Sequence, residues 1–317
     1  LHHLSVGQIT QEWQTTRNSF LTEYGGNLPL NAVPTVKDLV SNVECKLSST
    51  TVGVIILTKN KIDYLVKCVK SLIEKTSNQI TLKIIIGDTG STEESLIELQ
   101  DFVDHFDFRN HTILIHHLPF YNFAKNNNFL CREYLTQCEL ILCCNNDVEL
   151  INNALDIMVE TYQKNPYKCG TVGCRLLYSN LRIQHGGIVI YADKTAIKGA
   201  THFGLKSYYS AKSNLTQNIL GCTGAFLLIK TQLFLDLGGF NENTTECFED
   251  VILNIEARSK KNKVNFYQGK AVCFHFESLT RNESSDQTNR INYDFKNVLM
   301  PKIIQYKKTL KDFIVTI

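Results

Sequence analysis

The sequence predicts an α/β fold built on a mostly parallel central sheet with helices on both faces. A chain of 317 residues is long enough to bury one large core. Short segments that are apolar along their whole length recur through the first half, and segments with helical spacing separate them. Fully apolar strands that alternate with amphipathic helices are typical of parallel sheets buried on both faces. This is a nucleotide-binding type of architecture.

The elements of the first half alternate strictly. We expect strands over Val52–Leu57, Leu82–Ile86, Ile113–His117 and Leu140–Cys144, and helices over Ile62–Ile73, Leu96–Phe106 and Phe123–Leu135. Each strand is short and apolar, whereas each helix places its apolar residues three or four positions apart. The strand ends should therefore meet at one edge of the sheet, where ligands bind in such folds.

After Asp147 the pattern changes, and glycine-rich breaks separate the strands. We expect helices over Asn152–Tyr162 and Val251–Arg258, and strands over Val172–Leu177, Gly187–Tyr191, Ala225–Ile229, Val264–Tyr267 and Ala271–Phe274. This half should continue the first half as a mixed sheet. The expected organisation is an N-terminal extension (1–50), a domain of two halves (51–150 and 151–281) and a C-terminal helical tail (282–317).

Composition excludes several classes of protein. Lys and Arg number 33 against 31 Asp and Glu, so the charge of +2 gives no field that would attract nucleic acid. No apolar run approaches the roughly 20 residues that span a bilayer, and no signal peptide is evident, which indicates a cytoplasmic chain. The 11 cysteines form no C-x-x-C pair and indicate reduced core thiols.

The C-terminal stretch Lys302–Lys311 is basic and contains interspersed apolar residues, namely Ile303, Ile304 and Leu310. Such a pattern is compatible with a peripheral contact to an anionic membrane surface. A solvated helix explains it more simply.

Polar residues follow the predicted strands directly. The first strand ends in Thr58–Asn60, the second in Gly87–Ser91 with Asp88, and the fourth in Asn145–Asp147. A carboxylate at such a place can bind a base or ribose, or hold a magnesium or manganese ion on a diphosphate. Each also has a structural alternative, because Asp88 could cap the next helix and Asp147 could belong to a turn.

Two further candidates lie in the second half. Glu249–Asp250 opens the predicted helix, where the helix dipole alone favours carboxylates, but where a general base would also stay ionised. His275 ends the last strand and is either a structural histidine or a ligand for a borderline metal. The glycine-rich phosphate loops of kinases, GTPases and NAD enzymes are absent, as is the G-x-S-x-G elbow of hydrolases.

Eight segments, taken in order, resemble the inverting family 2 glycosyltransferases of GT-A fold. They are VIILTKN (54–60), IIIGDTGST (84–92), YNFAKNNN (121–128), ILCCNNDVEL (141–150), GCRLLYSNLRIQHGG (173–187), TGAFLLIKTQLFLDLGGFNE (223–242), CFEDVILNIEARSKKNKV (247–264) and VCFHFES (272–278). The closest subset is similar to bacterial rhamnosyl-, galactosyl- and N-acetylhexosaminyl-transferases of surface polysaccharide assembly.

The resemblance implies roles for the residues at the motif positions. The implied donor-binding residues are Thr58, Asn60, Asp88, Lys125, Asn128 and Asn146; the implied metal ligands are Asp147 and His275; the implied catalytic residues are Asp250, as the base, and Glu249. Thr223–Gly224 and the turn at 238–240 would shape the acceptor side. The family's usual D-X-D is N-N-D here, which leaves one carboxylate and implies either weaker metal binding or a dependence on His275.

The implied reaction is a single inverting displacement, with Mn²⁺ or Mg²⁺ as cofactor. Its donor is a nucleotide-diphosphate sugar, with uridine diphosphate the first choice and thymidine diphosphate the second, and its acceptor is a glycan or a lipid-linked glycan. Two alternatives remain open. One is a sugar nucleotidyltransferase, although Thr58–Asn60 lacks the glycine-rich loop that it would need. The other is a catalytically silent carbohydrate-binding domain of a larger synthase.

Overall fold

The computed structural model describes residues 40–194, 196–202, 215–276 and 285–316. The expected N-terminal extension therefore lies outside the described residues except for 40–50, as do Glu277 and Ser278 and much of the segment between Gly199 and Asn218. Residues 43–48 run along the helix α6 (Ala154–Lys164), where the backbone N–H of Val43 donates to Asn153 and that of Lys46 donates to Glu160.

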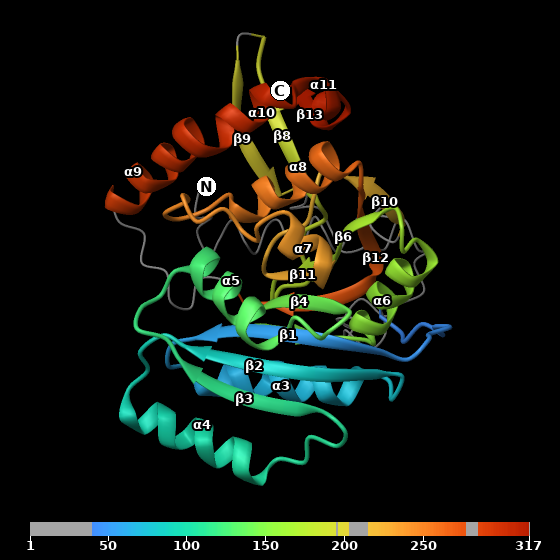
Figure 1. Ribbon diagram of the computed structural model, residues 1–317, viewed down its shortest axis with the longest axis vertical. Coiled ribbons are helices and arrows are strands. Elements are labelled where there is room, and N and C mark those ends of the chain that lie inside the picture. Colours follow the sequence, from blue (N-terminus) through green and yellow to red (C-terminus); the bar gives the residue numbers. More distant parts are fainter. Residues whose placement is uncertain (1–39, 195, 203–214, 277–284, 317) are drawn as a thin grey trace, which may run out of the picture.

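The central sheet continues through both halves of the chain (Figure 1). Its strands lie in the order β10 (Thr216–Ile219), β12 (Val264–His275), β6 (Cys169–Leu177), β11 (Phe226–Lys230), β4 (Leu140–Asn145), β1 (Thr50–Thr58), β2 (Ile80–Asp88) and β3 (Thr112–His117). The short strands β5 (Val148–Leu150) and β7 (Ile183–His185) pair with β12 and β6. β4, β1, β2 and β3 are parallel, and β11 runs antiparallel between β4 and β6. The predicted parallel sheet with a mixed continuation is confirmed.

Helices cover both faces of the parallel strands because successive side chains point to opposite sides. Val54 and Ile56 of β1 belong to a core that α3 (Ile62–Lys75), α4 (Glu93–His105) and α6 share. Ile55 and Leu57 belong to a second core that contains α5 (Phe123–Tyr134) and α7 (Thr231–Asp236). All four of these β1 side chains are less than one-tenth exposed.

Two details of the second half differ from the sequence expectation. The segments 264–267 and 271–274 belong to one strand, β12, whose register against β6 shifts between Gln268 and Val272. A bulge of this kind leaves polar residues in the middle of a strand, which is why the sequence suggests two strands. A separate three-stranded sheet is formed by β8 (Ile188–Ala192), β9 (Ile197–His202) and β13 (Ile314–Thr316).

The C-terminal segment packs onto the domain rather than extending from it. It comprises α9 (Ser285–Asp294), a π-helix (Phe295–Leu299), α10 (Met300–Gln305), α11 (Lys307–Leu310) and the strand β13, which pairs in parallel with β8. Leu299, Ile303 and Leu310 are fully buried against α8 (Glu249–Lys261) and β8. The expected helices are present, but the segment ends in a strand.

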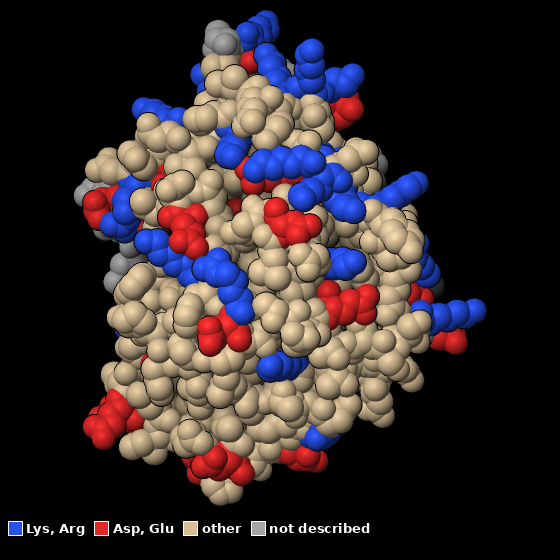
Figure 2. All heavy atoms as spheres, in the orientation of Figure 1, with Lys and Arg blue, Asp and Glu red and all other residues tan. Residues whose placement is uncertain are grey.

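The basic stretch near the C-terminus is less exposed than the sequence suggests. Ile303 and Leu310 are buried, Ile304 is 64% exposed, and Lys302 donates to Glu256 at 2.5 Å. Lysine and arginine side chains are frequent over the upper half of the face in Figure 2, with acidic side chains among them. Of the three apolar side chains named for a membrane contact, one is left exposed.

All 11 cysteines are free, and nine are buried. Burial raises the pKa of the Cys131 thiol to about 12, which keeps it protonated. The expected location of most cysteines in the core is confirmed. Among the described residues, no helix combines the length and the apolar character that crossing a membrane requires.

Candidate active site

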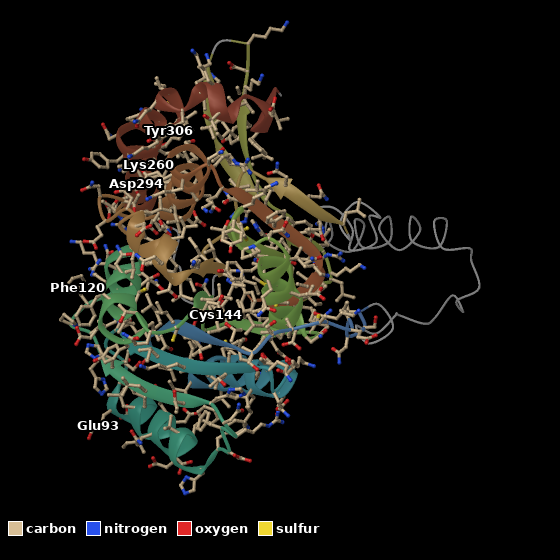
Figure 3. All side chains as sticks on the ribbon, turned by 45° about the vertical axis from the view of Figure 1, so that its right-hand side comes forward. Glu93, Phe120, Cys144, Lys260, Asp294 and Tyr306 are labelled. Atoms are coloured by element: carbon tan, nitrogen blue, oxygen red, sulfur yellow. The ribbon has the colours of Figure 1, made fainter. Side chains whose placement is uncertain are left out.

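The carboxyl ends of β1, β2 and β4 bring three of the predicted site residues together. Thr58 and Asp88 are register partners at the ends of β1 and β2, and both side chains are buried. The amide Nδ2 of Asn146, just beyond β4, donates to the Thr58 hydroxyl at 3.0 Å. Cys144, two residues earlier, lies in the interior (Figure 3). The polar residues at the ends of these strands thus lie along one edge of the sheet.

Asp88 has a carboxylate surrounded by hydrogen-bond donors. The backbone N–H of Ser91 donates to Oδ1 at 3.0 Å, and Nδ1 of His117 at the end of β3 lies 3.2 Å from Oδ2. Burial by itself would raise the pKa of Asp88, but the hydrogen bonds from Ser91, His117 and Gly90 outweigh it and hold the pKa below its ordinary value. Asp88 is therefore a preorganised acceptor for an N–H or hydroxyl of a ligand.

Asn60 connects β1 to the start of α4. It adopts a left-handed conformation with φ of 57°, its backbone N–H donates to the Ser91 hydroxyl at 2.7 Å, and its Oδ1 accepts from the Thr92 N–H at 2.8 Å. The N-cap of α4 is Thr92. Asp88 stabilises the preceding turn but leaves the cap position to Thr92, so its carboxylate stays at the edge of the sheet.

Asp147 and His275 meet beside the same edge because β5, which follows Asp147, pairs with the end of β12. Oδ1 of Asp147 lies 3.3 Å from Nε2 of His275, and both side chains are at most 12% exposed. The amide of Asn145 is 3.1 Å from the same Nε2. On the other side of the ring, Nδ1 is 2.7 Å from Oε1 of Gln184 in β7. A carbonyl oxygen accepts, so Nδ1 donates and Nε2 of the neutral ring keeps its lone pair.

The donor set of Asp147 and His275 fits a divalent cation. One carboxylate oxygen and one imidazole nitrogen face each other, and a partly hydrated Mn²⁺ or Mg²⁺ usually needs few protein ligands because substrate phosphates supply the rest. Among the described residues there is no group of three or more His, Cys, Asp and Glu side chains that would form a complete cage. The site would therefore hold its ion together with a diphosphate.

Asp250 is held at the amino end of α8 by neighbouring backbone. Its Oδ2 accepts from the N–H of Gly224 at 2.9 Å, and its Oδ1 accepts from the N–H of Val251 at 2.6 Å. The preceding Phe248 has a φ of 76°, a left-handed conformation that is costly for an aromatic residue. Gly224 lies just before β11, which pairs with β4, so Asp250 lies near the edge that carries Asp147.

Glu249 is half-buried beside Asp250. Asn128 is fully buried: its amide nitrogen donates to the carbonyl of Phe240 at 2.8 Å and its Oδ1 accepts from the Phe240 N–H at 2.8 Å. Lys125 is exposed on the same helix, α5. Among the contacts of the described residues, none joins Lys125 or Asn128 to the other predicted site residues. Asn128 holds the 238–242 turn.

Three site-forming residues were not predicted as such: His117, Gln184 and His185. The ring of His185 is buried, which lowers the pKa well below its ordinary value, an effect that nearby His202 and His275 reinforce. The neutral Nε2 accepts from the N–H of Thr223 at 3.3 Å. Gln184 and His185 thus link the candidate metal ligand to the loop that holds Asp250. His117 follows an apolar run and so had a sequence signal, whereas Gln184 and His185 follow a single apolar residue and had none.

Comparison with known protein families assigns the sequence to one of them. Residues 53–238 match the model of glycosyl transferase family 2. The chain belongs to this family. The matched region runs from within β1 to beyond β11 and therefore includes the positions of Thr58, Asp88 and Asp147.

Two curated bacterial proteins are similar to this family 2 chain. It is 30% identical over 245 residues to uncharacterized protein y4gI of Sinorhizobium fredii, with 76% of this chain and 26% of that protein covered. It is 28% identical over 235 residues to the O-antigen biosynthesis protein RfbC of Myxococcus xanthus, with 73% and 18% covered. The chain thus spans about a quarter or less of the length of these relatives.

Solved structures share the fold at low sequence identity. The crystal structure of GalNAc-T7 with UDP, GalNAc and Mn²⁺ superposes with a TM-score of 0.56 and 12% identity, covering 84% of this chain and 55% of that one. The mannosyltransferase PcManGT from Pyrobaculum calidifontis, in complex with GDP-Man and Mn²⁺, gives 0.53 and 11%, covering 96% and 82%. The GT-A fold expected from the resemblance is confirmed.

Proposed function

We propose that the chain transfers a sugar, with inversion, from a nucleotide-diphosphate sugar to a glycan or lipid-linked glycan in bacterial surface polysaccharide biosynthesis. The proposal is supported by the positions of three carboxylates: Asp88 ends β2, Asp147 follows β4 and Asp250 lies in the first turn of α8, all next to one edge of the sheet. Hydrogen bonds join these positions: Asn146 reaches Thr58 beside Asp88, and the Asn145 N–H donates to the Ala225 carbonyl beside Gly224.

The relatives support the choice of substrates. RfbC is named for O-antigen biosynthesis, and the two solved neighbours are complexes of UDP or GDP-mannose with Mn²⁺. We propose a hexosyl donor linked to UDP, with thymidine diphosphate as the second choice. A cytoplasmic reaction is part of the proposal. It is supported by two close pairs of free cysteines, Cys68 with Cys144 (Sγ to Sγ 3.6 Å) and Cys174 with Cys273 (3.8 Å), because free thiols are typical of reducing compartments.

In the proposed mechanism, Thr58 and Asp88 bind and orient the nucleoside. Asp250 removes the proton of an acceptor hydroxyl while that oxygen attacks the anomeric carbon, and the bond to the diphosphate breaks on the opposite face. The N–H groups of Gly224 and Val251 donate to the two oxygens of this carboxylate and fix its direction. A divalent cation held by Asp147 and His275, when bound, offsets the charge of the departing diphosphate.

Donor binding and turnover together test this proposal. Thermal unfolding is measured against UDP-, TDP- and GDP-sugars with and without MnCl₂, and nucleotide release is then followed for each donor that stabilises. A ligand at 100 times its dissociation constant adds about 2.7 kcal/mol to the free energy of unfolding. Metal-dependent stabilisation followed by release is expected. Stabilisation without release, with any glycan acceptor, would indicate the silent binding domain, and release of pyrophosphate from a nucleoside triphosphate would indicate a nucleotidyltransferase.

A further inference from the structure

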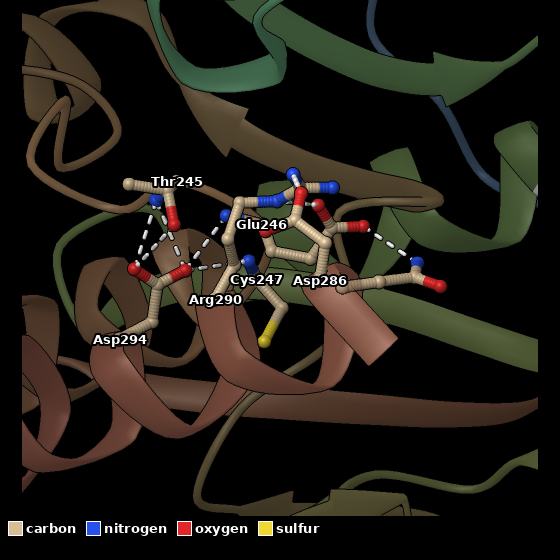
Figure 4. A network of polar contacts seen from close by, with 7 residues as sticks. Thr245, Glu246, Cys247, Asp286, Arg290 and Asp294 are labelled. Atoms are coloured by element: carbon tan, nitrogen blue, oxygen red, sulfur yellow. Dashed lines mark hydrogen bonds and ion pairs between the residues drawn. The ribbon is translucent and has the colours of Figure 1, made fainter. Parts of the chain in front are cut away.

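Asp294 is a fully buried carboxylate at the end of the C-terminal helix α9. It accepts hydrogen bonds from a loop 47 to 49 residues earlier in the chain. The backbone N–H of Thr245 lies 2.9 Å from both carboxylate oxygens, the N–H of Glu246 lies 2.7 Å from Oδ2, and that of Cys247 lies 3.1 Å from it. The Thr245 hydroxyl adds a bond of 3.0 Å to Oδ1 (Figure 4).

The Asp294 carboxylate occupies the place where successive backbone N–H groups, a so-called nest, would bind an anion. Three successive N–H groups that point to one side form a concavity that favours negative charge. Hydrogen bonds to an ionised acceptor are shorter and stronger than neutral ones. Burying an unpaired carboxylate would be very unfavourable, so the carboxylate and the loop hold each other in place.

A second set of contacts connects the same loop to α9. Glu246 accepts from Nε2 of Gln287 at 2.7 Å and from Nε of Arg290 at 3.3 Å. Arg290 also contacts Asp286 one turn earlier. The loop 245–247 is therefore bound to α9 at two points, one buried and one at the surface.

The loop leads directly into the candidate base. Cys247 is followed by Phe248, with its left-handed backbone, and then by Glu249 and Asp250. A strained residue of this kind persists only when the chain on both sides is held. On its far side, the Ile252 N–H donates to the Phe248 carbonyl at 2.9 Å and Gly224 binds Asp250. On its near side, Asp294 supplies the restraint.

We propose that Asp294 is a positioning residue for Asp250, so that the C-terminal segment 285–316 is part of the catalytic unit. The inference rests on the proposed function, in which Asp250 is the base. A misplacement of about 1 Å at a reacting group can cost about 100-fold in rate. The proposed donor-binding residues Thr58 and Asp88 lie on β1 and β2, away from this loop. Loss of Asp294 should therefore lower kcat and leave donor binding unchanged.

The test replaces Asp294 with asparagine, which keeps the shape but removes the charge and turns an amide toward the N–H groups. UDP release is measured with the UDP-sugar that stabilises most and MnCl₂. We expect kcat to fall about 10- to 100-fold while the donor KM changes less than twofold. Asp312→Asn, an exposed aspartate of the same segment, should match wild type. In an Asp250→Asn background, Asp294→Asn should cause no further loss, because it acts through Asp250.

Hydrogen exchange supplies a readout independent of turnover. Asp294→Asn should speed exchange in peptides covering 245–252 and leave those of β1 and β2 unchanged. If Asp294→Asn does not fold, Thr245→Val, which removes one bond to the carboxylate, should give the same exchange pattern and a few-fold lower kcat. Wild-type kcat, a further loss in the Asp250→Asn background, or unchanged exchange would overturn the inference. Failure of the proposed function would look different: the wild type would release no nucleotide, whereas the exchange result would still stand.

Discussion

The backbone N–H of Gly224 donates to Oδ2 of Asp250 at 2.9 Å, which ties the start of α8 to the start of β11. Because β11 pairs with β4, this bond sets the position of Asp250 relative to the strand end that carries Asp147. The helix α8 and the central sheet are thus joined beside the proposed site of sugar transfer. The adjacent Thr223 is held in turn by His185.

Asp250→Asn should abolish most of the turnover. General base catalysis contributes about 10²- to 10⁴-fold to a rate, and the amide cannot accept the proton, so we expect kcat to fall by that factor with the donor still bound. Nucleotide release and calorimetric donor binding measure the two effects. Glu249→Gln is the matched control at the neighbouring position and should lose less than tenfold. Equal losses in both variants would show that the base is not Asp250 alone.

Gln184→Leu should weaken metal binding without removing a metal ligand. The Gln184 carbonyl accepts from Nδ1 of His275, so the lone pair of Nε2 faces Asp147, where an ion would bind. Loss of such a supporting contact typically lowers metal affinity 10- to 100-fold. Titration of turnover with MnCl₂ should show this shift, with a normal rate at saturation. Gln232→Leu, at an exposed glutamine of α7, is the control, and an unchanged MnCl₂ midpoint in Gln184→Leu would refute the assignment.

His117→Ala should raise the pKa of Asp88, because it removes one of the hydrogen bonds that lower it. A carboxyl group with a lowered folded-state pKa stabilises the protein above its unfolded-state pKa of about 3.9, and this contribution is lost as the pH falls through the folded-state value. The stability difference between wild type and His117→Ala should therefore be present at neutral pH and shrink below about pH 4. Carboxyl NMR titration measures the pKa directly. His105→Ala, on the exposed side of α4, should leave Asp88 unchanged.

The strands of the first half were predictable because each contains a continuous apolar run and pairs with its neighbours without a shift in register. The bounds of β1, β2 and β4 lie within two residues of the expected ones, and the polar residues at or just after their ends are the candidates Thr58, Asp88 and Asp147. Strands of three or four residues, such as β5 and β7, are too short to show a period. Those two strands nevertheless bring His275 to Asp147 and Gln184 to His275.

Long-range polar contacts were not predictable in the same way. In the sequence, Asp294 looks like an ordinary residue of a polar helix. The N–H groups that donate hydrogen bonds to it come from a loop almost 50 residues away. The resemblance implies a donor-binding role for Asn128, but it gives no indication that the Asn128 amide hydrogen bonds to the 238–242 turn. Which polar residue meets which partner depends on the assembled fold, and periodicity carries no information about it.

The turn held by Asn128 gives a last prediction, about stability. Gly238 and Gly239 both have left-handed backbone, with φ of 85° and 79°. A Cβ on Gly238 would meet nothing within 4 Å, so Gly238→Ala should cost only the backbone term, about 1–2 kcal/mol. A Cβ on Gly239 would lie 2.2 Å from Oδ1 of Asn128. The Asn128 amide is fully buried and cannot easily move away from such a close contact.

Gly239→Ala should therefore destabilise by the same backbone term plus about 1–3 kcal/mol of overpacking. Urea unfolding of the two variants side by side measures the difference, because they share composition, backbone conformation and neighbourhood. A larger loss for Gly239→Ala is expected, with unchanged donor binding at Asp88. If the two variants lost equal stability, the Asn128 amide would be free to move, and its hydrogen bonds to Phe240 would not be what holds the turn.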